Sequence, residues 1–206
     1  MKKELYNQLE IVNNIERLIE EEEIQNKKIE NITINQNINS VSFEVVKMSH
    51  ISCIHGNLEK NSFKDVIFEN CDFSNTSFES CSFVRCQFEN CKLIGCNLTD
   101  NTIYQTSFHE TNASYANFSM AVLDRAEFHQ TNLKNSYFQE NKLKNVIFQE
   151  SNLAQAQIYK TSLRGIDIST CNIEEIAISI EDIKGTIIDQ LQAMDLLYLL
   201  GVKIKE

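Results

Sequence analysis

Large apolar side chains recur at every fifth position of this chain. The phase holds from Leu58 to Ile188 without an insertion, with Ala113 as its one small member, and all twelve phenylalanines lie on it, including Phe43. A period of five is neither that of a helix nor that of a flat strand. It predicts a repeat in which each unit buries its apolar side chain by stacking on copies of itself.

A second series of smaller residues lies two positions before the first. It includes Thr76, Ala116 and most of the cysteines. Residues two apart point to the same side of a strand, and the other three positions are mostly polar residues that suit turns. Each unit is therefore expected to be a short strand followed by a corner. Because proline is absent and only five glycines occur, we expect a continuous ladder with few special turns.

Several units resemble those of the pentapeptide-repeat proteins, whose unit is written A(D/N)LXX. Examples are residues 131–135 (TNLKN), 151–155 (SNLAQ) and 71–75 (CDFSN). The resemblance covers residues 41–188 and implies an all-β solenoid, a right-handed quadrilateral β-helix with four units per coil. In that fold, one interior column would hold Phe68, Phe88, Phe108, Phe128 and Phe148.

The two ends differ from the repeat. Residues 1–40 are expected to form an N-terminal helix over about 2–27 and a short lead-in strand over 31–40. One apolar stripe at helical spacing carries the helix prediction; it consists of Leu5, Leu9, Val12, Ile15 and Ile19. Residues 189–206 are expected to form a short helix, with Asp189 and Gln192 as a capping box, and a terminal strand.

The C-terminal residues carry a narrower resemblance. Residues 183–185 (IKG), 192–197 (QAMDLL) and 199–202 (LLGV) resemble the C-termini of the Qnr-type quinolone-resistance proteins. That resemblance implies a homodimer joined through the C-terminus and binding to DNA gyrase and topoisomerase IV, with protection from quinolones or from a gyrase-directed toxin. The dimerisation residues expected on this basis are Leu191, Met194, Leu197, Tyr198, Leu200, Val202 and Ile204.

The charge pattern is uneven. The net charge of -10 argues against direct binding to nucleic acid, which needs a basic surface. Counting twenty residues per coil gathers seven acids on one outer face: Glu69, Glu89, Glu110, Glu127, Glu150, Asp167 and Asp189. The preceding face mixes five acids with Lys64, Arg85, Arg125, Lys142, Lys144, Arg164 and Lys184.

We expect the acidic face to imitate duplex DNA and to dock on a basic groove of a type II topoisomerase. Alternatively, the acids only keep the rod soluble. The other functional candidate is a non-enzymatic scaffold or adaptor whose partner engages the N-terminal helix.

Cysteine and histidine raise the question of a metal. Cys81, Cys86, Cys91 and Cys96 would lie one per side of a single coil, but their spacing of five matches no familiar zinc motif. Small buried residues are the favoured interpretation. Cys71 and Cys91 would stack one coil apart, within disulfide reach.

His109 and His129 would stack beside Glu89 and Glu110, where a polar ladder is favoured over a metal site. No ordered catalytic set or phosphate loop is present. We therefore expect no enzyme activity, no cofactor and no metal. The sequence shows no secretory signal and no apolar run of membrane-spanning length. Together with seven cysteines, this predicts a cytoplasmic protein with reduced thiols.

Overall fold

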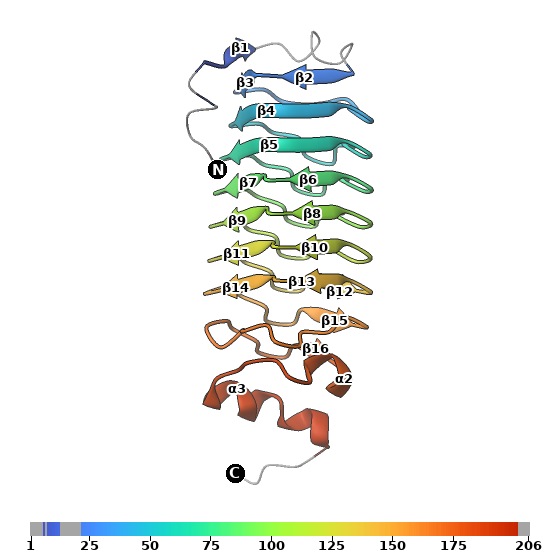
Figure 1. The fold of residues 1–206 in the computed structure, drawn as a ribbon, viewed down its shortest axis with the longest axis vertical. Helices are drawn as coiled ribbons and strands as arrows, with labels where there is room; N and C mark the ends of the chain where they lie inside the picture. The colour runs from blue at the N-terminus through green and yellow to red at the C-terminus, as the bar shows by residue number, and fades with distance from the viewer. Residues whose placement is uncertain (1–5, 7, 13–21, 202–206) are drawn as a thin grey trace.

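The computed structural model describes residues 6, 8–12 and 22–201, which form one elongated parallel β-helix (Figure 1). Its strands are β1 (Glu10–Val12), β2 (Glu23–Gln25), β3 (Lys27–Glu30), β4 (Ser42–Ser49), β5 (Ser62–Glu69), β6 (Ser82–Val84), β7 (Gln87–Glu89), β8 (Thr102–Tyr104), β9 (Ser107–His109), β10 (Val122–Asp124), β11 (Glu127–His129), β12 (Tyr137–Gln139), β13 (Lys142–Lys144), β14 (Ile147–Gln149), β15 (Gln157–Tyr159) and β16 (Ala177–Ile178). Helices α2 (Ile180–Ile183) and α3 (Gln190–Asp195) and the 3-10 helix η2 (Leu197–Leu200) come after the strands.

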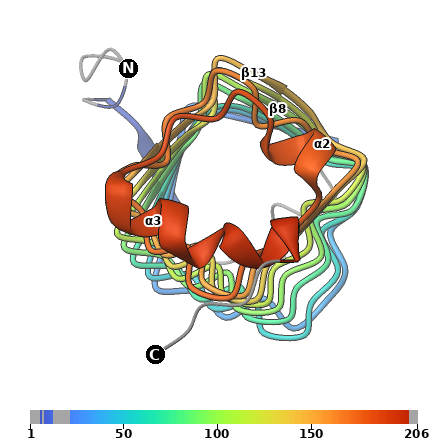
Figure 2. The same ribbon diagram turned by 90° about the horizontal axis from the view of Figure 1, so that it is seen from below.

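The strands stack in a register of twenty residues. Phe43 pairs with Phe63 and Met48 with Phe68 in β4 and β5, and isolated bridges continue the same offset on the other two sides, as between Asp72 and Lys92. Seen along its axis, the coil has the outline of a four-sided frame (Figure 2). The predicted quadrilateral β-helix is therefore confirmed.

The four sides are named by their central residues. Side 1 carries Phe63 and Phe83, side 2 Phe68 and Phe88, side 3 Phe73 and Leu93, and side 4 Phe78 and Leu98.

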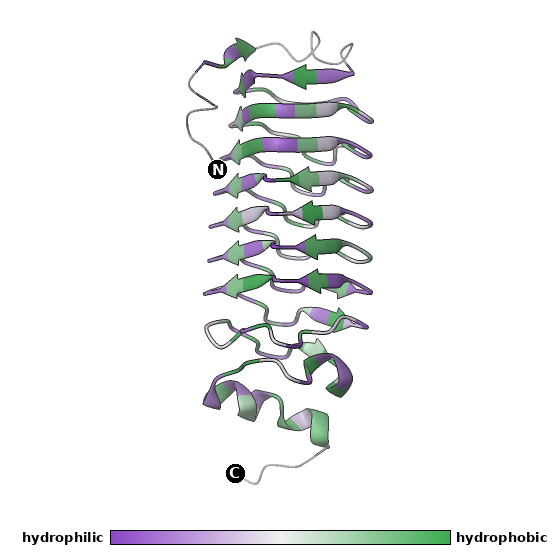
Figure 3. Ribbon diagram, viewed as in Figure 1, coloured by the Kyte–Doolittle hydropathy of each residue, from purple (hydrophilic) through white to green (hydrophobic). Residues whose placement is uncertain are grey.

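The interior is built by the apolar series. Hydrophobic segments recur at matching places in successive strands (Figure 3). On side 2, the rings of Phe68, Phe88, Phe108, Phe128 and Phe148 are stacked, with successive centroids 4.5, 4.8, 4.8 and 5.0 Å apart. These centroid distances match the spacing of hydrogen-bonded strands, about 4.8 Å, so each ring rests on the ring of the next coil.

The corners contradict the expectation of few special turns. Almost every unit ends in a residue with a left-handed backbone, and most of these are not glycine: φ is 54° at Arg85, 47° at Glu110 and 61° at Met120. That conformation costs an L-residue roughly 1–2 kcal/mol. Hydrogen bonds of the ladder offset the cost, since the amides of Arg85 and Glu110 donate to Tyr104 and His129 at 2.9 and 3.1 Å. Glycine is therefore not required at a corner.

The predicted N-terminal helix is wrong within the described residues. Strand β1 occupies Glu10–Val12 and pairs with β3, and strand β2 occupies Glu23–Gln25 and pairs with β4. Leu5, Ile15 and Ile19 lie outside the described residues.

The first coil begins before residue 41. Ile24 and Ile29 are buried and pair with Phe43 and Met48, at an offset of nineteen residues. Ile24, Ile29 and Ile34 continue the period of five. The next buried residue of the series is Ile38, only four positions later. Because this side is one residue shorter than the others, Ile24, Ile29 and Ile34 are out of phase with the series that starts at Ile38.

The C-terminal end is covered by α2, α3 and η2, which lie across the last coil (Figure 2). Asp189 and Gln192 form the capping box that the sequence predicts. The buried Gln192 side chain also donates hydrogen bonds to the carbonyls of Ile168 and Cys171, at 2.8 and 2.7 Å. These two carbonyls belong to the end of the ladder, where no further coil follows, and Gln192 of α3 supplies their hydrogen-bond donor.

Candidate functional site

Side 2 carries the seven acids that the sequence assigns to one face, but in more than one row. Glu69 and Glu89 are direct neighbours in the ladder, whereas Glu127 lies in another row, next to Ser107 and Ile147. Glu110 and Glu150 occupy left-handed corner positions at the edge of side 2. Asp167 bridges to Ile187, and Asp189 is the N-cap of α3. The acidic surface is therefore a strip several residues wide.

Three acids of the strip have a basic side chain beside them. Lys47 Nζ lies 3.0 Å from Glu69, and the hydrogen bond from Lys47 holds the pKa of Glu69 below its ordinary value. His109 Nδ1 lies 3.5 Å from Glu89, and His129 Nε2 lies 3.0 Å from Glu127.

Two other acids of the strip lack such partners. Within the described part of the chain, Glu110 and Glu150 make no ion pair. Gln130 Nε2 donates to Glu150 at 2.8 Å. Lys47 is the only lysine or arginine of side 2 between Val46 and Gln190, so the strip remains negative.

Side 1 divides into two halves. In the N-terminal half, cations are paired: Lys64 with Glu44, and Arg85 with Asp65 through two hydrogen bonds of 2.7 and 2.5 Å. The Tyr6 hydroxyl donates to the Asp65 carbonyl at 2.8 Å, which places Tyr6 against this half.

The other half of side 1 is more basic. Arg125 and Lys144 share Asp124, at 3.5 and 3.4 Å. No ion pair is formed there by Lys142, Arg164 or Lys184 among the residues that the structure describes.

The C-terminal cap exposes an apolar surface. Leu191 and Leu200 are 75% and 67% exposed, and Met194 and Tyr198 are also exposed. The Tyr198 hydroxyl donates to the Ile176 carbonyl, which fixes the ring at the surface.

Three other predicted dimerisation residues are placed differently. Leu197 is only half-exposed, and Val202 and Ile204 lie outside the described residues. Leu196 and Leu199, which the sequence interpretation did not single out, pack against the core.

The four cysteines of one coil are interior residues. Cys81, Cys86 and Cys96 are buried and donate to the carbonyls of Leu58, Phe63 and Phe73, at 3.1, 3.3 and 2.8 Å. Burial raises the pKa of Cys81 and of Cys86 to about 12. They lie on separate sides of the frame, and no group of three or more potential ligands within the described residues is arranged for a metal. The rings of His109 and His129 are 6.4 Å apart.

Sequence reasoning missed a set of buried asparagines. Asn61, Asn101 and Asn141 lie in the small-residue column behind side 1, one in every second coil. Asn61 accepts from the Val41 amide at 2.8 Å and donates to the carbonyls of Ile38 and Leu58, at 2.6 and 2.8 Å. Their spacing of forty residues was the available signal.

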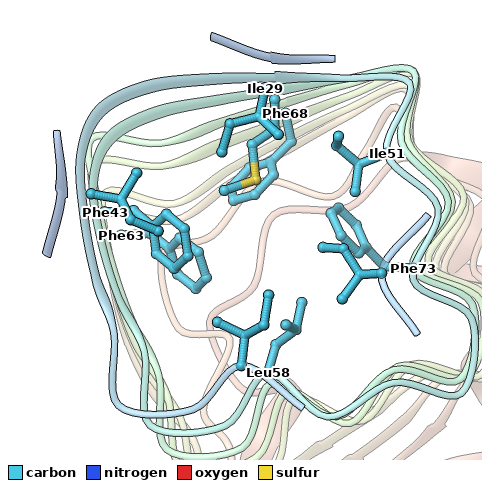
Figure 4. A pocket seen from close by; sticks show the side chains of 11 residues that line it. Ile29, Phe43, Ile51, Leu58, Phe63, Phe68 and Phe73 are labelled. Carbon is cyan, nitrogen blue, oxygen red and sulfur yellow. The ribbon is translucent and has the colours of Figure 1, made fainter. Parts of the chain in front are cut away.

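An apolar gap in the interior of the first coils is too small for a ligand. A cavity of about 20 Å³ lies in the first coils, between isoleucines and the rings of Phe43, Phe63, Phe68 and Phe73 (Figure 4). A single water needs roughly that volume and several polar partners, which this lining lacks. No helix in the described part of the chain is both long and apolar enough to cross a membrane.

Known proteins share the repeat and the fold. Residues 81–158 match a family model described as a pentapeptide repeat region. Full-length QnrB1, a plasmid-mediated fluoroquinolone resistance protein, is similar with a TM-score of 0.52 at 19% identity, over 94% of this chain and 95% of that chain. HetL, a pentapeptide repeat protein involved in heterocyst differentiation regulation in the cyanobacterium Nostoc, has 14% identity over 87% of this chain and 98% of its own, with a TM-score of 0.37. Comparison with curated proteins gives no match.

Proposed function

We propose that this chain, which has the pentapeptide-repeat fold and matches that repeat family over residues 81–158, is a non-enzymatic binding protein whose acidic side 2 docks on a type II topoisomerase. The target surface is the basic groove of DNA gyrase or topoisomerase IV that otherwise holds duplex DNA. The biological result is protection of the enzyme from quinolones or from a gyrase-directed toxin, in the cytoplasm.

One observation carries the proposal: side 2 of the four-sided rod holds seven acids and, between Val46 and Gln190, a single lysine. A strip of one sign steers a partner of the opposite sign and fixes its orientation. Rows about 4.8 Å apart are sparser than the charges of duplex DNA, one per roughly 1.7 Å. The strip therefore imitates the sign and the straightness of DNA, and not its charge density.

The C-terminal cap supports a second element of the proposal, a homodimer. Four exposed apolar residues, Leu191, Met194, Tyr198 and Leu200, lie on one short segment at the end of the rod. A second copy that packs on this segment removes them from water and doubles the length of the acidic rod.

A charge-reversal variant tests the docking surface. Glu89→Lys, Glu110→Lys and Glu150→Lys together should abolish binding to purified gyrase in a surface-plasmon-resonance assay. The matched control, Glu79→Lys with Asp100→Lys and Glu174→Lys, makes the same change in net charge on sides 3 and 4 and should still bind. Equal binding by both variants would remove side 2 from the proposal.

The activity assay is DNA supercoiling by gyrase with and without ciprofloxacin. The native protein should restore supercoiling in the presence of the drug, and the side 2 variant should not. If the native protein neither binds gyrase nor changes its activity, the choice of partner is wrong. An adaptor engaged through an N-terminal helix is disfavoured, because strands occupy the described part of that segment.

A further inference from the structure

Cys71 and Cys91 form the one pair of cysteines, among the seven in the chain, that are separated by a full coil of twenty residues. Both lie in the small-residue column behind side 3, and each is 2% exposed. All seven are free thiols, and the other five have no cysteine one coil above or below them. The proposed docking surface does not use this pair, so a role for the two thiols is independent of topoisomerase binding.

The two thiols have the same orientation. Cys71 Sγ donates to the carbonyls of Glu69 and Met48 at 3.4 and 3.5 Å. Cys91 Sγ makes the equivalent contacts one coil later, with the carbonyls of Glu89 and Phe68, both at 3.4 Å. Because the contacts repeat, the two sulfurs are separated by the rise of the coil, about 4.8 Å.

That separation suits a metal bridge better than a disulfide. A disulfide requires sulfurs about 2.0 Å apart and Cβ atoms about 3.5–4.5 Å apart, so the coils would have to approach each other. A metal ion with two bonds of about 2.3 Å to thiolates spans about 4.6 Å in a straight line. Soft thiolate ligands select Cu(I), zinc and iron–sulfur clusters. Structural zinc and the clusters are held by four protein ligands, so a site with two thiolates favours Cu(I).

We propose that Cys71 and Cys91 bind one Cu(I) ion as a linear two-thiolate bridge between adjacent coils. Two S–H bonds are lost, two protons leave to solvent and two metal–sulfur bonds form, with no change in the oxidation state of copper or sulfur.

Access to the pair is provided from the edge between sides 2 and 3. A depression of about 360 Å³ is lined by both cysteines and by Asn70, Asp72, Asn90, Lys92, Glu110 and Asn112. The bridge carries one negative charge, and Lys92 is the cation in this lining. Its ammonium lies 3.3 Å from Asp72.

The test is a titration of the reduced, full-length protein with Cu(I) under anaerobic conditions, against a chromophoric Cu(I) chelator. The native protein should withdraw one Cu(I) per chain, and X-ray absorption should show two sulfur neighbours. Cys71→Thr and Cys91→Thr should each lose this uptake. Threonine fits the column, since Thr111 and Thr131 occupy its next two positions, and circular dichroism checks that the variants fold.

Matched controls are Cys81→Thr and Cys86→Thr, which remove buried thiols that have no cysteine neighbour in the ladder. They should take up copper as the native protein does. The proposal is overturned if the native protein takes up no Cu(I), if uptake survives in Cys71→Thr, or if the controls lose it to the same extent. Uptake should also fall as the pH is lowered, because protons compete for the thiolates.

Discussion

At the scale of single residues, the interior of this rod is held by two kinds of aromatic contact. Along the axis the rings stack, as between Phe88 and Phe108 at 4.8 Å and 8°. Around one coil they meet edge to face, as between Phe73 and Phe78 at 5.2 Å and 77°. Both geometries are favourable for aromatic pairs, so each ring is fixed by neighbours in two directions.

Phe108 tests this packing. It lies between the stacked rings of Phe88 and Phe128 and is 1% exposed. Phe108→Ala should lower the free energy of unfolding by about 3–5 kcal/mol, through lost burial and a cavity. Urea unfolding followed by circular dichroism measures the change. His109→Ala, at the adjacent half-exposed position, is the control and should change stability much less; equal effects of the two substitutions would contradict the assigned core.

Asn61 tests the buried polar column. Asn61→Ala leaves the Val41 amide and the carbonyls of Ile38 and Leu58 without this side-chain partner. A buried polar group without a partner costs about 1–3 kcal/mol, so the variant should unfold at lower urea concentration. Asn61→Thr should recover part of the loss, because Thr161 occupies the same column. No recovery would indicate that a single hydroxyl cannot replace the Asn61 side chain, which makes one hydrogen bond as acceptor and two as donor.

At the scale of elements, the repeat was predictable and the ends were not. The same apolar and small positions recur in every unit, so a unit that departs from the pattern can still be assigned from the units before and after it. The N-terminal segment lacks that redundancy: a helical stripe through Val12 competed with the three isoleucines Ile24, Ile29 and Ile34. One side is a residue short between Ile34 and Ile38, and this interrupts the period of five. In the structure, β2 and β3 pair with β4, so the period of five and not the helical stripe describes residues 23–30.

The same limit applies to the candidate surfaces. Twenty residues per coil were enough to place these seven acids on one side, but not to show that Lys47 forms an ion pair with Glu69 or that His109 and His129 contact Glu89 and Glu127. These contacts depend on side-chain rotamers. At the cap, helical periodicity identified an apolar face but did not separate Leu199, which packs on the core, from exposed Leu200.

The cap should protect the last coils. Gln192→Ala removes the side-chain half of the capping box, in which Gln192 accepts from the Asp189 amide, and both hydrogen bonds to the carbonyls of Ile168 and Cys171. We expect amide hydrogen exchange to accelerate in residues 163–178, with little change near Phe88. Uniform acceleration along the whole rod would show that the cap stabilises all coils together and does not act locally.

The proposed dimer belongs to this scale as well. Leu191→Glu with Leu200→Glu places two charges in the exposed apolar surface and should convert a dimer into a monomer in sedimentation velocity. Met120→Glu, at an exposed apolar residue far along the rod, should leave the dimer intact. A native protein that sediments as a monomer at micromolar concentration would refute the dimer.

At the scale of the whole molecule, the β-helix converts a sequence period into a charged strip. Any residue twenty positions from another lies beside it, so the seven acids, although distant in sequence, occupy one side of a straight rod. The cations of side 1 lie on the adjacent side, and sides 2 and 4 are opposite each other. A partner that approaches side 2 therefore meets mostly negative charge, and its approach should be governed by long-range electrostatics.

Salt provides the test of that electrostatic steering. Exposed charges are screened over about 10 Å at 0.1 M ionic strength and over about 3 Å at 1 M, while short-range contacts change little. Raising the salt concentration should therefore slow association with gyrase strongly and leave the dissociation rate nearly constant. The side 3 and side 4 control variant should keep the same salt dependence as the native protein, whereas reversing only Glu110 should reduce it. An association rate that does not change with salt would mean that the acids of side 2 serve solubility, and that the partner recognises another surface.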